Sequence, residues 1–290
     1  MKPLFERVVI AGVGLIGGSL ALAGKKAGIF KTVIGVGRGK ANLDKALTLG
    51  VVDEATTDLG MAVRGADLFF AAVPVESVID VCLKAADGMK TGCIITDGGS
   101  VKKKIVEELQ LRLPSSVRFV GGHPVAGSEK SGAGSADESL FKNRYTILTP
   151  TPSTDPQAVD LVRDMWKAAG ADVVTMGPDE HDEIMAMISH LPHFAAYALV
   201  DAVVKADGSG LMRRFVAGGF KDTTRIASSD PQMWRDIFSM NKERLIESIN
   251  TFERSLSELK QMVEKNNFDG LKARLDKIRS TRLKMDDHCG

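Results

Sequence analysis

The sequence predicts an α/β fold in two parts: a doubly wound, mostly parallel sheet with helices on both faces, and then an all-helical domain. Three observations predict it. A glycine-rich motif, Gly12-Val13-Gly14-Leu15-Ile16-Gly17, directly follows a strand-like run. Short β-branched runs then alternate with helix-like segments, and after Met176 the strand signal fades. We therefore place the two domains at residues 1–176 and 177–290.

The strand candidates of the first domain are short and regularly spaced. In chain order they are residues 7–11, 32–36, 67–73, 92–97, 117–120, 145–149 and 172–176. Helix signals between them support this phasing. For example, Asp155-Pro156 places a capping residue before a proline at the first helical position, and Gly170 ends the same segment.

A long helix is expected in the second domain, because apolar residues from Met240 to Met262 recur mainly every three to five positions. Such a stripe can face the protein's own core or a second subunit. Because this domain offers little sheet to cover, we favour burial against a second copy of the chain, which predicts a homodimer.

Composition excludes several classes of partner. The 38 basic and 37 acidic residues leave a formal net charge of +1, which argues against nucleic-acid or membrane-surface binding. A small-molecule partner is expected instead. Cys82, Cys93 and Cys289 lie far apart without a C-x-x-C spacing, so we expect neither disulfides nor a thiol metal site, and a reducing cytoplasm fits best. The uncharged run at residues 8–24 contains five glycines and is too short for a membrane span.

The glycine-rich motif predicts dinucleotide binding. Gly12 permits a tight turn, Gly14 lets the backbone approach a pyrophosphate, and Gly17 lets helix and strand pack closely. Leu15 and Ile16 open the helix whose N-terminus faces the anion.

The cofactor itself is NAD or NADP, and the sequence leaves this choice open. An NAD site usually has an acidic residue after the second strand, to bind the ribose 2′-hydroxyl. Here the chain reads Val36-Gly37-Arg38-Gly39-Lys40, without a carboxylate. Arg38 can either meet a 2′-phosphate or remain a solvated loop arginine.

Two polar residues follow strands of the predicted sheet. Ser100 comes after the strand that ends at Asp97, and His123 comes after the strand that ends at Val120. The carboxyl ends of parallel strands are where such sheets gather their ligands, so both side chains are expected near a nicotinamide. His123 is the candidate general base.

The helical domain contributes two polar segments. Ser189-His190-Leu191-Pro192-His193 has two histidines three positions apart, but no acidic ligand accompanies them, so no metal is predicted. Lys221 and Arg225 follow the pair Gly218-Gly219 and face either solvent or a ligand. A guanidinium there suits a carboxylate, which it can bind with two parallel hydrogen bonds.

Four separated motifs carry a family resemblance across nearly the whole chain. They are residues 97–102, the stretch from Gly121 to Gly132, residues 189–193 and residues 218–234. In this order and at this spacing they resemble the prephenate/arogenate dehydrogenase family of tyrosine biosynthesis. The resemblance implies a Rossmann-type first domain, an all-helical dimerisation domain, and NAD(P)-dependent oxidative decarboxylation of prephenate or arogenate.

The resemblance also implies residue roles. His123 would accept the substrate hydroxyl proton, and Ser100 would lie beside that hydroxyl and the nicotinamide. Arg225 would bind a carboxylate. The remaining residues implied in the substrate pocket, some of them across a dimer, are His193, Lys221, Glu129, Asp222 and Trp234.

Two alternative functions remain open to the sequence. A β-hydroxyacid dehydrogenase or an imine reductase also joins a dinucleotide domain to a helical one, but would more naturally use a lysine or no ionisable base than His123. A non-catalytic NAD(P)-sensing protein would bind cofactor without turnover, and would leave Ser100, His123 and Arg225 without a shared purpose. The sequence does not distinguish prephenate from arogenate.

Overall fold

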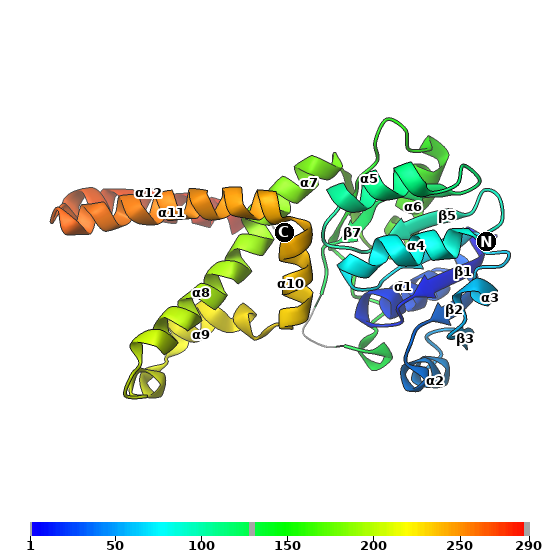
Figure 1. Ribbon diagram of the computed structural model, residues 1–290, viewed down its shortest axis with the longest axis horizontal. Coiled ribbons are helices and arrows are strands. Elements are labelled where there is room, and N and C mark those ends of the chain that lie inside the picture. The colour runs from blue at the N-terminus through cyan, green and yellow to red at the C-terminus, as the bar shows by residue number, and fades with distance from the viewer. Residues whose placement is uncertain (1, 128–130, 287–290) are drawn as a thin grey trace. The chain divides into compact units, whose positions relative to one another are not determined.

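The computed structural model describes residues 2–127 and 131–286, which form two compact units (Figure 1). The first unit comprises residues 1–242 and the second residues 243–290. The predicted boundary after residue 176 lies in the connection between a strand that ends at Thr175 and a helix that begins at Pro178. As a domain boundary it stays a prediction.

A six-stranded sheet of the order β3-β2-β1-β4-β5-β6, with every neighbouring pair parallel, forms the centre of the first unit. Its strands are β1 Phe5–Ala11, β2 Phe30–Val36, β3 Glu54–Thr56, β4 Leu68–Ala71, β5 Ile94–Asp97 and β6 Arg118–Val120. This is the doubly wound order of dinucleotide-binding folds, so the predicted fold class is confirmed.

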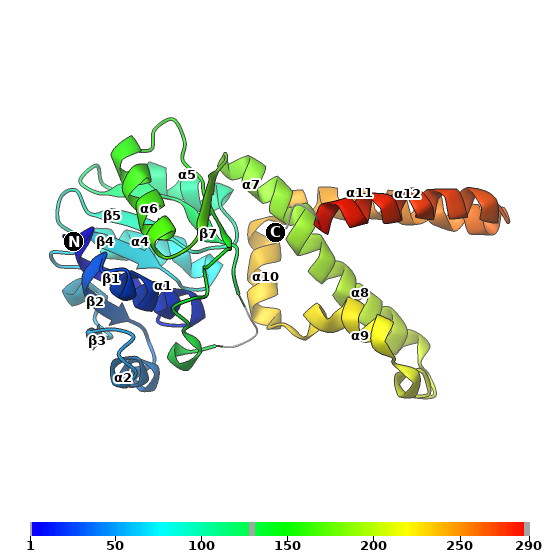
Figure 2. The same ribbon diagram turned by 180° about the vertical axis from the view of Figure 1, so that it is seen from behind.

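Helices cover both faces of this sheet because its strands are apolar on both faces. Val8 and Ile10 of β1 pack in one core cluster with residues of α1 and α6, whereas Val9 and Ala11 pack in another with residues of α4 and α5. Figure 1 shows α4 and α5 in front of the sheet, and Figure 2 shows α1 and α6 in front from behind. The helices of this part are α1 Leu15–Lys26, α2 Lys40–Thr48, α3 Leu59–Ala62, α4 Val78–Ala86, α5 Lys103–Arg112 and α6 Pro156–Ala168.

The sequence-derived strands do not all join this sheet. A second sheet of three strands contains β7 Gly122–Pro124, β8 Tyr145–Leu148 and β9 Asp172–Thr175, with β7 antiparallel to β8. Two of its strands were expected, but β7, like β3, is only three residues long and too short for a periodic signal. His123 therefore lies within a strand of the second sheet and does not merely follow a strand of the first.

Helices form the remainder of the first unit. They are α7 Pro178–Met185, a π-helical segment Ala186–His190, α8 Leu191–Ala206, α9 Gly218–Thr224 and α10 Pro231–Met240, with short 3₁₀ turns at Met212–Phe215 and Arg225–Ser228. Within the described ranges, residues 178–206 are the stretch long and apolar enough to cross a membrane by length and composition. That stretch also carries His181, Asp182 and His190, which are buried inside the protein.

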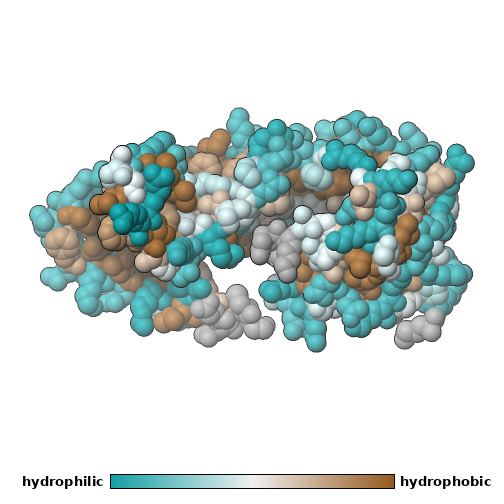
Figure 3. All heavy atoms as spheres, turned by 90° about the horizontal axis from the view of Figure 1, so that it is seen from below, coloured by the Kyte–Doolittle hydropathy of each residue, from teal (hydrophilic) through white to brown (hydrophobic). Residues whose placement is uncertain are grey.

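The second unit contains α11 Lys242–Glu264, except for its first residue, and α12 Phe268–Asp286. The predicted long helix is present, but it begins after Met240, because α10 ends there. Much of its apolar stripe is exposed in the single chain, including Phe252 and Leu256. Figure 3 shows apolar surface gathered over the helical segments. Burial of this stripe against a second subunit stays a prediction.

Candidate active site

The glycine-rich turn joins β1 to α1 and has no room for side chains on its inner side. Gly12 has φ +93°, and a Cβ there would lie 2.2 Å from the Ala72 carbonyl oxygen. A Cβ at Gly17 would lie 2.2 Å from the carbonyl oxygen of Gly12. Both glycines are therefore required by the close approach of backbone to backbone.

The outer side of the same turn is open. A Cβ at Gly14 would have no atom within 4 Å. Gly14 caps α1 without a side-chain hydrogen bond, and the first turn carries no acidic residue. The N–H groups at the start of α1, including those near Leu15 and Ile16, are thus available to an anion. These residues fit a dinucleotide pyrophosphate.

Arg38 lies exposed just beyond β2, and the stretch from Val36 to Lys40 contains no carboxylate. Asn42 fixes the neighbouring loops: its Nδ2 donates to the Val13 carbonyl oxygen at 2.7 Å, and its Oδ1 accepts from the Ala133 N–H at 2.8 Å. The geometry thus leaves the surroundings of Arg38 open to either NAD or NADP.

The loop after β5 carries Ser100 and packs against the start of α1. A Cβ at Gly98 would lie 3.0 Å from Phe70 Cζ and 3.4 Å from Ile16 Cγ2. Ser100, two residues further on, is half-buried. The loop is therefore held close to the glycine-rich turn, and the place of Ser100 beside the cofactor stays a prediction.

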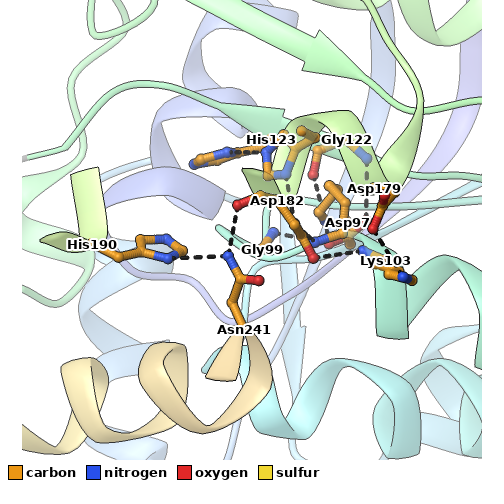
Figure 4. A network of polar contacts seen from close by, with 11 residues as sticks. Asp97, Gly99, Lys103, Gly122, His123, Asp179, Asp182, His190 and Asn241 are labelled. Carbon is orange, nitrogen blue, oxygen red and sulfur yellow. Dashed lines mark hydrogen bonds and ion pairs between the residues drawn. The ribbon is translucent and has the colours of Figure 1, made fainter. Parts of the chain in front are cut away.

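His123 is half-buried on β7 and begins a row of hydrogen bonds (Figure 4). Its Nδ1 lies 2.8 Å from Nε2 of His181, whose own Nδ1 lies 2.8 Å from Oδ1 of Asp182. Asp182 also accepts from two backbone N–H groups at the start of α5: that of Lys102 at 2.7 Å and that of Lys103 at 3.0 Å. The row thus ties α7 to β7 and to α5.

A buried ion pair lies beside this row. Lys102 and Asp97 are fully buried, and the Lys102 Nζ contacts both Asp97 Oδ2 and, at 2.9 Å, the Gly122 carbonyl oxygen. Asp97 also accepts from the N–H groups of Gly99 and Gly122, at 2.9 and 3.2 Å. These extra hydrogen bonds offset the desolvation that a buried pair costs. They hold the end of β5 and the start of β7 together.

The surroundings keep His123 neutral. Burial lowers its pKa well below the usual 6.5, and the neighbouring basic groups His181, Lys102 and His190 lower it further, because a proton on His123 would lie close to them. Burial also lowers the pKa of His181, although Asp182 opposes that shift. A neutral imidazole is the form that can accept a proton.

A second cluster contains residues of α8 and α10. The His193 ring stacks on Trp234, with centroids 3.6 Å apart and planes 24° apart. His193 Nδ1 lies 2.9 Å from the Ser189 carbonyl oxygen, so this nitrogen carries the proton and Nε2 is an acceptor. Burial lowers the pKa of His193, and the positive charge of Arg225 adds to this effect.

Asn241 and His190 lie between this cluster and the row: the His190 ring meets the Trp234 ring edge-on, with centroids 6.2 Å apart. The Asn241 Nδ2 donates to the Asp182 carbonyl oxygen at 2.8 Å and lies 3.2 Å from Nδ1 of His190 (Figure 4). The His190 Nδ1 is therefore in contact with the side-chain amide of Asn241. No group of three or more His, Cys, Asp or Glu side chains suited to a metal occurs in residues 2–127 and 131–286.

The structure thus brings some of the expected residues together. His193 and Trp234 stack on each other, while His123 lies in the hydrogen-bonded row. Arg225 is exposed on the 3₁₀ turn Arg225–Ser228, near enough for its charge to lower the pKa of His193. Lys221 and Asp222 are exposed on α9. Glu129 lies outside the described residues, so its predicted place in the pocket stays a prediction.

The sequence reasoning missed His181, Asp182 and Asn241. The adjacent pair His181-Asp182 near the start of a helix was an available signal. Its partner His123, however, is 58 residues away in sequence. Only the fold shows that α7 approaches β7.

Comparison with known proteins decides the family. Residues 20–175 match the model of the prephenate dehydrogenase nucleotide-binding domain, and residues 177–277 match that of the prephenate dehydrogenase dimerization domain. The chain belongs to the prephenate dehydrogenase family. The family resemblance seen in the sequence motifs is therefore confirmed.

Individual relatives of this family cover almost the whole chain. Prephenate dehydrogenase of Bacillus subtilis is 40% identical over 273 residues, which are 93% of this chain and 74% of the relative. Cyclohexadienyl dehydrogenase of Zymomonas mobilis is 35% identical over 98% of both chains. The crystal structure of Aquifex aeolicus prephenate dehydrogenase with hydroxyphenyl propionate and NAD⁺ has a TM-score of 0.92 at 36% identity, covering 97% of this chain and 98% of that one.

Proposed function

We propose that the protein catalyses the NAD(P)-dependent oxidative decarboxylation of prephenate to 4-hydroxyphenylpyruvate and CO₂, a step of tyrosine biosynthesis. The observation that carries this proposal is the neutral imidazole of His123 in a chain of the prephenate dehydrogenase family. Its neighbour Gly122 is hydrogen-bonded to Asp97 at the end of β5, and the loop after β5 packs on the dinucleotide-binding turn. The complex of the Aquifex aeolicus enzyme with NAD⁺ supports the nicotinamide cofactor.

His123 is the proposed base. Bound NAD(P)⁺ would supply the hydride acceptor. As hydride leaves the ring carbon that carries the hydroxyl, the O–H bond of that hydroxyl breaks and its proton forms a bond to Nε2 of His123. The carbonyl so formed accepts the electron pair of the breaking C–C bond, CO₂ departs, and the ring becomes aromatic. Positioned proton transfer of this kind contributes about 10²- to 10⁴-fold.

The other site residues bind and orient the substrate in this proposal. Ser100 donates to the reacting hydroxyl beside the cofactor. Arg225 binds a carboxylate with its planar fork, and the proximity of its charge to the His193–Trp234 stack supports that role. Lys221, Asp222 and Glu129 complete the pocket.

The functional form is proposed to be a homodimer in the cytoplasm. The match to a dimerization domain supports the dimer, as do the exposed apolar side chains of α8, α11 and α12. Buried free thiols at Cys82 and Cys93 support a reducing compartment. Light scattering of the purified protein tests the dimer.

The deciding experiment is a spectrophotometric matrix of prephenate and arogenate against NAD⁺ and NADP⁺, in which reduced cofactor and CO₂ are followed. We expect turnover of prephenate. Turnover of arogenate alone would correct the substrate, whereas cofactor binding without turnover of either would support an NAD(P)-sensing protein and reject the proposal. Turnover of a β-hydroxyacid or of an imine in their place would support the other alternative enzymes.

Cofactor choice is tested at Arg38. If Arg38 meets a 2′-phosphate, the Arg38→Ala variant raises KM for NADP⁺ and leaves KM for NAD⁺ unchanged. If Arg38 is a solvated loop residue, neither KM changes.

A further inference from the structure

In the row of Asp182, His181 and His123, what each group can donate or accept decides which nitrogen carries each proton. Figure 4 labels the two ends of this row, Asp182 and His123. As a carboxylate, Asp182 only accepts, and it takes hydrogen bonds from the backbone N–H groups of Lys102 and Lys103. Nδ1 of His181, 2.8 Å from Asp182 Oδ1, must therefore carry a proton.

The remaining protons follow from that assignment. In neutral His181 a proton on Nδ1 leaves Nε2 as the acceptor. Because that Nε2 lies 2.8 Å from Nδ1 of His123, the His123 Nδ1 must donate to it. The lone pair of neutral His123 is then on Nε2, the nitrogen on the far side of the ring from His181. The opposite tautomer would place two lone pairs 2.8 Å apart.

We propose that His181 and Asp182 are positioning residues for the proton transfer: they hold His123 in the tautomer whose Nε2 can accept the substrate proton. This inference rests on the proposed function of His123 as the base. The hydrogen bonds keep the same donors and acceptors after the substrate proton has bound to His123, because Nδ1–H of His123 still donates to His181. The negative charge of the Asp182 carboxylate stabilises the positive charge that His123 then carries.

The geometry around the row favours one orientation of both rings. His181 is fully buried and meets the His123 ring edge to face, at 68° between planes and 5.0 Å between centroids. Asp182 is held by the two N–H groups of α5, and its own carbonyl oxygen is held by Asn241. Because the acceptor end is fixed by backbone, the tautomer of His123 is fixed by the fold.

Two variants of His181 distinguish its proposed role in fixing the His123 tautomer from a purely structural role in packing. In His181→Asn, the amide nitrogen can replace Nδ1 and keep the bond to Asp182, but the side chain is too short to reach His123. In His181→Gln, the longer side chain can present an amide oxygen to Nδ1 of His123. We expect kcat with prephenate to fall about 10- to 100-fold in His181→Asn, a part of what a positioned base contributes. KM should be nearly unchanged, and His181→Gln should recover most of the loss.

The tautomer itself is read by long-range ¹H–¹⁵N spectra of the histidine-labelled, full-length protein, with the His123 signals assigned from a His123→Asn sample. We expect the proton on Nδ1 in the wild type and both tautomers in His181→Asn. His190→Asn is the matched control, because His190 is equally buried but bonds Asn241, and it should leave the His123 tautomer unchanged.

The proposal is overturned by a proton on Nε2 of His123 in the wild type, by an unchanged kcat and tautomer in His181→Asn, or by the same tautomer change in His190→Asn. The spectra need no substrate. A wild type that does not turn over prephenate would therefore reject the proposed function while the tautomer is still measured.

Discussion

The glycine-rich turn and the histidine row are two sites built in opposite ways. The turn offers backbone and not side chains to a ligand: Gly12, Gly14 and Gly17 lie within six residues, and none of them carries a side chain. The row consists of a half-buried polar side chain from β7 and two buried ones from α7, anchored on backbone up to 80 residues away in sequence. The first site is a local property of the chain, whereas the second exists only once the chain has folded.

This difference predicts that changes in the row reduce chemistry and leave cofactor binding intact, whereas changes in the turn do the reverse. The largest expected effect is at His123. His123→Asn should lower kcat about 10²- to 10⁴-fold with little change in KM, because the base is lost and the binding groups remain. Steady-state kinetics and titration with NAD⁺ measure both. Loss of NAD⁺ binding in His123→Asn would contradict the prediction that changes in the histidine row leave cofactor binding intact.

Arg225 is expected to affect substrate binding more than chemistry. Arg225→Ala and Arg225→Lys should raise KM for prephenate about 10- to 100-fold, because a lysine does not replace a two-point hydrogen bond to a carboxylate. Arg214→Ala, which removes the same charge from another exposed arginine of the first unit, is the matched control. An unchanged KM for Arg225→Lys would assign Arg225 to structure.

Two alanine substitutions sharpen the comparison within the turn. Gly17→Ala should lower stability by about 1–3 kcal/mol, because its Cβ meets the Gly12 carbonyl oxygen at 2.2 Å. Gly14→Ala meets no atom within 4 Å, so its melting temperature should stay at the wild-type value while KM for the cofactor rises several-fold. Thermal unfolding and cofactor titration separate them. Equal loss of stability in both variants would contradict the open outer face of the turn.

The smallest expected effect is on stability against pH. Burial lowers the pKa of His190 from 6.5 to about 4. Below pH 6.5 the unfolded chain therefore takes up a proton that the folded protein does not, and stability falls as the pH drops from 6.5 toward 4. Between pH 7 and pH 5.5 the contribution of His190 should lower the free energy of unfolding by about 1 kcal/mol. Urea unfolding at one protein concentration measures it, and His190→Asn should show a shallower fall. An identical slope in that variant would contradict the neutral, buried state of His190.

The sequence predicted the features that depend on neighbouring residues. The strand-turn-helix around Gly12 and the cap at Asp155, whose side chain accepts from the Ala158 N–H at 2.9 Å, are both local arrangements. The alternation of strands and helices sufficed for the fold class. His123 was singled out because glycines and a proline surround it, although its strand was missed.

What the sequence could not predict depends on long-range packing. The two sheets part at Gly121, between β6 and β7, where a Cβ would lie 2.5 Å from Thr149 Oγ1. The partners of His123 depend on where α7 meets α5, and no periodicity contains that information. Trp234 was expected to shape a pocket, and the structure adds that its ring is almost completely buried and stacked on His193.

The π-helical segment Ala186–His190 has a consequence for the helix that follows it. Its ring closes from the Leu191 N–H to the Ala186 carbonyl oxygen, one residue wider than an α-helical turn. Since each residue of an α-helix turns the chain by about 100°, that additional residue rotates all of α8 by the same angle. A single deletion anywhere in this segment would therefore carry His193 away from the indole of Trp234 without altering either side chain.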